Sequence, residues 1–229
     1  MSIDFYYAPT VNSLRARISL EECGCAFVAH RVDLGGAAPI SDEFAAASPF
    51  RLVPALVDST DARHPVRVSQ SGAILLYLAD KSGWLLPHDP ALRASALEWC
   101  MMAVSDASPL NTLIKYLTRD VGDGASSSTA YLERRLDRFF SSAEQALGQS
   151  GSEYLLGAYG VADIALFPVV HARWGRLNES RAHRRLCDWA KRIAARPAVK
   201  RALAGNGDSN LDHWRSVDPT SASNKGDFQ

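Results

Sequence analysis

The chain has 229 residues, 47% of them hydrophobic, which is enough apolar material for one large core or for two modest domains. Its 25 basic residues balance its 25 acidic residues, and this neutrality does not point to a nucleic-acid partner. No apolar run approaches the roughly 20 residues of a membrane-spanning helix, and the first residues lack the basic and apolar regions of a signal peptide. We therefore expect a cytoplasmic protein with no membrane and no nucleic acid among its partners.

The first part of the chain alternates strand and helix patterns in the order β-α-β-α-β-β-α. Strands are predicted at residues 3–7, 27–32, 55–57 and 66–69, the last two as a hairpin. Helices are predicted from possible caps at Thr10 to Ser13 up to about Glu22, from Ser41 onward, and over residues 71–81. This order, with a proline directly before the third strand, is similar to that of thioredoxin-like domains. We expect a thioredoxin-like domain over residues 1–82.

The rest of the chain has no strand pattern. A linker is predicted at residues 83–91, which contain Pro87 and Pro90 and show no periodicity. Helices are predicted at residues 92–116, 131–147, 161–174 and 183–196, with a flexible break at 122–128. The fold class is therefore α/β followed by all-α, with an all-helical domain at residues 92–210 and a mobile polar tail at 211–229.

An arginine-rich stretch at residues 173–201 has two interpretations. Acidic residues interrupt it at Glu179 and Asp188, and Trp189 and Ile193 contribute to an apolar helical stripe. A nucleic-acid surface usually needs a stronger basic excess, so a solvated helix face is the favoured interpretation.

Cysteine and histidine spacing excludes several chemistries. The four cysteines, Cys23, Cys25, Cys100 and Cys187, are too few and too irregularly spaced for a disulfide framework, so we expect reduced thiols. The six histidines form no motif with metal-ligand spacing, and no phosphate-binding glycine motif is present. We expect no metal.

The segment from Val53 to Ser71 carries the most specific pattern. Val53-Pro54 precedes a short apolar strand, which makes Pro54 a candidate cis proline and would turn the backbone of Val53 outward. Gln70-Ser71 then opens a helix whose first turn offers free N–H groups and a hydroxyl. An exposed backbone edge beside a helix N-terminus suits a small peptide with a free carboxylate. Taken singly, the proline is more simply a turn and Ser71 a helix cap.

This combination, V-P-A-L followed by Q-S-G-A-I-L-L-Y-L, resembles the glutathione transferase family. G-V-A-D at Asp163 and R-P-A-V at Arg196 are similar to family motifs farther along, although Gly160 stands where the family has a capping hydroxyl. Asp163 is still placed to bond back to the Gly160 N–H. The resemblance implies that Val53, Pro54, Gln70 and Ser71 bind glutathione, which is then a cosubstrate.

The donor to the glutathione thiol should come from the start of the first helix. Its segment Y-Y-A-P-T-V-N-S-L has no cysteine there and resembles the bacterial Nu class, which uses Thr and Asn. That resemblance implies Thr10 and Asn12 as catalytic residues, while Tyr6 and Ser13 are the alternatives. Either Thr10 or Asn12 alone could equally be only a helix cap.

The resemblance implies a homodimeric glutathione-dependent transferase or disulfide-bond reductase. Thr10 and Asn12 would stabilise a glutathione thiolate that attacks a disulfide or a small electrophilic substrate. The second substrate is expected in the interdomain cleft, near Met101, Met102, Tyr116 and Trp174. The alternative is a non-catalytic binding or regulatory protein on the same scaffold.

Overall fold

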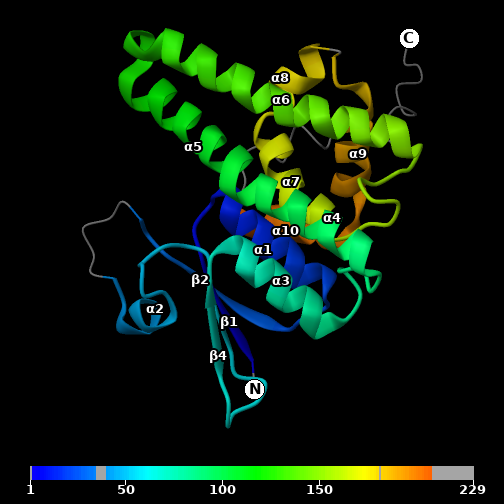
Figure 1. Ribbon diagram of the computed structural model, residues 1–229. Helices are drawn as coiled ribbons and strands as arrows, with labels where there is room; N and C mark the ends of the chain where they lie inside the picture. Colours follow the sequence, from blue (N-terminus) through cyan, green and yellow to red (C-terminus); the bar gives the residue numbers. More distant parts are fainter. Residues whose placement is uncertain (1, 35–39, 181, 208–229) are drawn as a thin grey trace, which may run out of the picture.

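A computed structural model describes residues 2–34, 40–180 and 182–207, and its first part is built on a four-stranded sheet (Figure 1). The strands are β1 (Ile3–Tyr7), β2 (Phe27–Arg31), β3 (Ala55–Asp58) and β4 (Val66–Ser69). Their order is β2-β1-β3-β4, with β1 parallel to β2 and antiparallel to β3, and with β3 and β4 forming the predicted hairpin. The thioredoxin-like prediction is confirmed.

Three helices cover the sheet, namely α1 (Val11–Glu22), α2 (Asp42–Ala47) and α3 (Ser71–Ser82). Residues of α1 and α3 pack on one face against Ile3, Phe5 and Leu56. On the opposite face, α2 contributes Phe44 to a smaller cluster with Tyr6. The N-termini of α1 and α3 follow the ends of strands β1 and β4, so two helix starts are brought to the same side of the domain as the helical half (Figure 1).

The described residues of the second part form helices joined by loops, with no strand among them (Figure 1). Its elements are α4 (Pro90–Met101), the π-helical η1 (Met102–Ala107), α5 (Ser108–Tyr116), the π-helical η2 (Leu117–Val121), the 3₁₀ turn η3 (Gly122–Ala125), α6 (Ser126–Ser150), α7 (Val161–Ala172), α8 (Trp174–Ser180), α9 (Arg184–Ala195) and α10 (Pro197–Asn206). Among the described helices, none is long and apolar enough to cross a membrane.

Helix α7 is the centre of this half, because every residue from Val161 to His171 is buried. A helix that is apolar all round must be enclosed by other elements. Its neighbours belong to one continuous apolar cluster that also includes Leu14 and Leu75 of the first part. The two halves therefore share a core, and their exact limits at residues 82 and 92 stay a prediction.

The helix predictions were incomplete. The predicted run over residues 92–116 is interrupted by the π-helical η1, and α6 begins at Ser126, inside the predicted flexible break. Helices α8 and α10 were not predicted, since at 7 and 10 residues they are too short to show a clear helical periodicity. Helix α10 packs along α1, where Arg196 and Arg201 pair with Glu22 and Glu21. The predicted tail at 211–229 lies outside the described residues.

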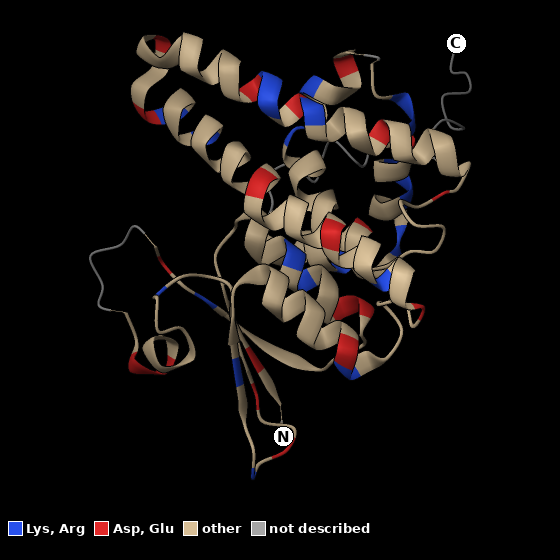
Figure 2. Cartoon of the chain, in the orientation of Figure 1, with Lys and Arg blue, Asp and Glu red and all other residues tan. Residues whose placement is uncertain are grey.

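Charges of both signs are intermingled over the helical half (Figure 2). Within residues 173–201, arginines pair with glutamates from other elements: Arg173 and Arg176 with Glu133, Arg185 with Glu144, Arg192 with Glu153, and the two arginines that meet α1. This pairing supports the interpretation of the stretch as a structural, charge-balanced helix surface.

Candidate functional site

The loop before β3 has the backbone geometry that the sequence predicted. The Val53-Pro54 peptide bond is cis, and Val53 makes no backbone hydrogen bond with another described residue. Ser48 fixes the preceding turn, because its hydroxyl donates to the Leu52 carbonyl at 2.9 Å and accepts from the Leu52 N–H at 3.0 Å. The backbone polar groups of Val53 are thus free to pair with an extended ligand.

The start of α3 lies near this loop, because β4 leads into α3 and pairs antiparallel with β3, with Ala55 opposite Ser69. Gln70 precedes the helix with φ of 75°, a left-handed value that is uncommon for a residue with a side chain. Its side chain is exposed and makes no capping bond. Ser71 is the first residue of the helix and is 5% exposed. An outlier of this kind at a helix start is typical of a functional position.

At the start of α1, Thr10 is a helix cap. Its hydroxyl accepts from the Ser13 N–H at 3.1 Å and lies 3.1 Å from the Ser13 hydroxyl, to which it donates. Ser13 is fully buried and also accepts from the Ala8 N–H. The Thr10 hydroxyl can therefore donate a hydrogen bond to a ligand only if its hydrogen turns away from Ser13.

Asn12 is the second residue of α1 and has a different partner. Its side-chain oxygen accepts a hydrogen bond of 2.8 Å from Nη1 of Arg15. The same nitrogen donates to the hydroxyl oxygen of Ser71, also at 2.8 Å. Two predicted site residues from separate helices, Asn12 and Ser71, are thereby brought together around one guanidinium group.

Arg15 is the residue that the sequence prediction missed. Its side chain is wholly buried, and its remaining bonds go to the Ser108 hydroxyl at 2.7 Å and to the Ala165 carbonyl at 2.9 Å. None of the described acidic residues forms an ion pair with it. Burial lowers the pKa of the guanidinium to about 10, so it stays charged at neutral pH. The sole sequence signal was its spacing of three residues from Asn12, because its other acceptors come from α3, α5 and α7.

The alternative donors lie elsewhere. Tyr6 is buried on the α2 face of the sheet, where its ring stacks on His30 at 4.9 Å. Burial, together with Asp4 and Glu43, raises its pKa. Ser13 lies beneath the Thr10 cap and has no exposed surface. Neither residue is as well placed as Asn12 to donate outward.

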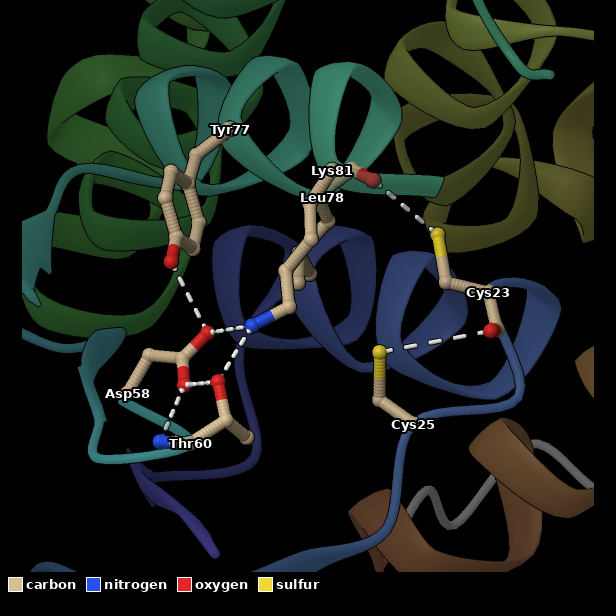
Figure 3. Close-up of polar contacts among 7 residues, drawn as sticks. All are labelled: Cys23, Cys25, Asp58, Thr60, Tyr77, Leu78 and Lys81. Atoms are coloured by element: carbon tan, nitrogen blue, oxygen red, sulfur yellow. Dashed lines mark hydrogen bonds and ion pairs between the residues drawn. The ribbon is translucent and has the colours of Figure 1, made fainter. Parts of the chain in front are cut away.

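The cysteines are all free, and none lies at the start of α1. Cys23 ends that helix and donates to the Leu78 carbonyl, and Cys25 lies just beyond it (Figure 3). Burial raises the pKa of Cys23 to about 11 and also raises that of Cys25. Both are poor nucleophiles at neutral pH.

An ionic cluster around the buried Asp58 carboxylate fixes the opposite end of α3. Lys81 and the Tyr77 hydroxyl both donate to Asp58 at the end of β3, and Thr60 donates to it through its N–H and its hydroxyl (Figure 3). The cluster fastens the helix that carries Ser71 to the sheet. The position of Ser71 therefore depends on how α3 packs on the sheet.

A cavity of about 490 Å³ opens beside Thr10, between the two halves. Its first-half wall includes Thr10 and Val11, and its helical wall includes Lys115, Arg119 and His171. The four residues expected near a second substrate do not line this cavity. Met101 of α4 and Tyr116 of α5 are about half-exposed outside it, whereas Met102 of η1 and Trp174 of α8 pack into the apolar core.

Two family models match the chain, the glutathione S-transferase N-terminal domain at residues 11–81 and the glutathione S-transferase C-terminal domain at residues 110–205. The disulfide-bond oxidoreductase YfcG of Escherichia coli is 33% identical over 216 residues, which span 92% of this chain and 99% of that protein. The chain belongs to the glutathione S-transferase family. Its resemblance to disulfide-bond oxidoreductases of that family, inferred from the Thr10 to Asn12 segment, is confirmed at this level.

Solved structures of the family are also similar to this chain. A glutathione transferase family member from Pseudomonas fluorescens, with two glutathione molecules bound, has a TM-score of 0.80 and 30% identity, over 88% of this chain and 92% of that one. A glutathione transferase from Pseudomonas putida, with one glutathione disulfide bound per subunit, has a TM-score of 0.78 and 28% identity, over 88% and 90%. No group of His, Cys, Asp or Glu that could hold a metal ion occurs among the described residues.

Proposed function

We propose that this glutathione S-transferase binds glutathione between the starts of α1 and α3 and uses its thiolate to reduce disulfides. The observation that carries the proposal is the meeting of Asn12 and Ser71 on one nitrogen of Arg15, beside the free backbone of Val53. The γ-glutamyl carboxylate would bind at Ser71 and the helix N-terminus, the peptide backbone along Val53, and the thiolate at Asn12. Gln70 would accept from the γ-glutamyl ammonium group through its side-chain oxygen.

The reaction we propose uses two glutathione molecules and no protein thiol. The bound thiolate attacks one sulfur of a substrate disulfide, which breaks the disulfide bond and releases one substrate thiolate. The resulting mixed disulfide is attacked by a second glutathione thiolate, which releases the other substrate thiol and leaves glutathione disulfide. The two electrons thus pass from two glutathione thiols to the substrate.

The cavity beside Thr10 is the place we propose for the second glutathione or the substrate disulfide. Lys115 and Arg119 on its helical wall offer positive charge to the carboxylates of a glutathione moiety. The Pseudomonas fluorescens relative holds two glutathione molecules, which agrees with a two-glutathione reaction. Conjugation to an electrophilic carbon would use the same thiolate and the same cavity.

Titration calorimetry with reduced and oxidised glutathione tests the binding step. We expect Ser71→Ala to weaken the binding of reduced glutathione by about 1 to 3 kcal/mol, because one hydrogen bond to a charged group is lost. The control is Ser142→Ala, since Ser142 is exposed on α6 and bonds only to its own helix. Equal affinities in the two variants would contradict the site.

A non-catalytic binding protein is the second candidate. It is favoured by the fact that the Thr10 hydroxyl is already hydrogen-bonded to Ser13 and is therefore less available to a thiolate. Binding of glutathione without turnover of any small disulfide would support that alternative. Absence of binding to either form at millimolar concentration would leave only a regulatory role on the same scaffold.

A further inference from the structure

Arg15 is a buried cation whose acceptors are all neutral. Its guanidinium has no exposed surface, and the four groups that accept from it are Asn12, Ser71, Ser108 and the Ala165 carbonyl. Burying an unpaired charge is unfavourable, and neutral acceptors offset only part of that free energy. An anion that binds close to Arg15 would supply the missing countercharge.

The hydrogen bonds of Arg15 also set the direction of its neighbours. Nη1 can only donate, so the Asn12 oxygen must face it and the Asn12 amide nitrogen must point away. The Ser71 oxygen likewise accepts from Nη1, so the Ser71 hydrogen is free for another acceptor. No acceptor for either donor is present among the described residues. Asn12 and Ser71 can each donate or accept hydrogen bonds, and Arg15 thus fixes both as donors that face outward.

We propose that Arg15 is a positioning residue that orients Asn12 and Ser71 as donors and selects the anionic form of the bound peptide thiol. This inference rests on the proposed glutathione site. The Arg15 charge does not contact the ligand. It acts through the two short hydrogen bonds to Asn12 and Ser71, and it thereby favours the ionised thiolate and carboxylate of the ligand.

Two measurements separate this role from a merely structural one. The first is the pKa of the bound glutathione thiol, followed by the ultraviolet absorbance of the thiolate. The second is the ratio of affinities for glutathione and for S-methylglutathione, whose sulfur cannot ionise. Loss of packing alone would weaken both ligands equally and leave their ratio unchanged.

For Arg15→Met, we expect the pKa of the bound thiol to rise by about one unit. The affinity for glutathione should then fall about tenfold more than the affinity for S-methylglutathione, at a pH where the wild-type complex is ionised. For Arg15→Lys, which keeps the charge but loses the planar fork, the thiol pKa should lie between those of the wild type and Arg15→Met. An unchanged thiol pKa and ratio in Arg15→Met would overturn the proposal.

A second pair of variants tests the charge while keeping Arg15, in case its replacement prevents folding. Ser108→Asp would place a carboxylate on Nη2, and Ser108→Asn has the same shape without the charge. We expect the pKa of the bound thiol to be about one unit higher in Ser108→Asp than in Ser108→Asn, because the aspartate carboxylate would offset the positive charge of the guanidinium group. Equal values would overturn the role of the Arg15 charge.

The outcomes also separate the inference from the function beneath it. If the wild-type protein binds neither glutathione nor S-methylglutathione, the proposed function is wrong and the role of Arg15 falls with it. If the wild type binds glutathione but the thiol pKa is the same across both sets of variants, the role of Arg15 alone is wrong.

Discussion

Asp58 shows how an ion pair at the far end of α3 from Ser71 supports the site. Its side chain is 2% exposed, and burial by itself would raise its pKa. The bonds from Lys81, Thr60 and Tyr77 outweigh that effect and hold the pKa of Asp58 well below its usual range. The native state therefore binds fewer protons here than the unfolded chain, and folding is favoured while the carboxylate is ionised.

We expect Asp58→Asn to lower the free energy of unfolding by about 2 to 3 kcal/mol at neutral pH, since Lys81 would lose its partner and the carboxylate its bonds. The difference should be full above the ordinary aspartate pKa of about 3.9 and should shrink as the pH falls below it. Urea unfolding of both proteins at several pH values measures this. A gap that is the same at acidic and neutral pH would show that the ion pair contributes little.

The start of α7 explains a departure from the family motif. Asp163 accepts from the Gly160 N–H at 3.1 Å, as predicted, and also from the Leu155 N–H and the Trp189 indole N–H. Gly160 lies against the Leu85 carbonyl oxygen, which would be 2.6 Å from any Cβ added there. The missing capping hydroxyl is therefore a consequence of close backbone packing between the linker and α7.

Gly160→Ser would restore the hydroxyl of the family motif, yet we expect it to destabilise the fold by about 1 to 3 kcal/mol, because the Leu85 backbone must move. Thermal unfolding compares it with Gly175→Ser on α8, where an added Cβ meets nothing within 4 Å. A Gly160→Ser protein as stable as that control would mean that the linker adapts freely.

The disulfide reaction we propose needs no cysteine of this chain. A variant with serine at Cys23, Cys25, Cys100 and Cys187 should, when folded, keep its glutathione-dependent reduction of a small disulfide. Thr10→Ala combined with Asn12→Ala should lose most of it, because the thiolate loses its donors. Loss of activity in the cysteine-free protein would assign the chemistry to a protein thiol, and survival in the double-alanine protein would return attention to Tyr6 or Ser13.

Association of two copies is a further property of the whole molecule that we expect. Phe50 and Leu52, in the loop before Pro54, are 72% and 55% exposed, and Leu92 and Met101 on α4 are about half exposed. Exposed apolar side chains of this kind are typical of interfaces. Phe50→Asp should shift the protein from dimer to monomer in light scattering, whereas Val121→Asp, at the far tip of α5 and η2, should not. A monomeric wild-type protein would contradict the expectation.

Local sequence patterns correctly predicted the order of strands and helices in the first half, the cis bond before Pro54 and the start of α3 at Ser71. These features depend on local rules: strand and helix periodicity, proline chemistry and capping, which act over a few neighbouring residues. The same rules placed Asp163 opposite the Gly160 N–H, because both groups lie within one helical turn.

The surroundings of Arg15 could not be predicted from the sequence, because they form only when distant segments of the chain pack together. Its acceptors stand 3, 56, 93 and 150 residues away along the chain. No periodicity in α1 distinguishes a solvated arginine from one that is buried under three other helices. Burial under α3, α5 and α7 removes the water that would otherwise screen and solvate the Arg15 charge. The same side chain would have little effect on its surroundings at the surface. In the core, it gives Asn12 and Ser71 a directed positive potential.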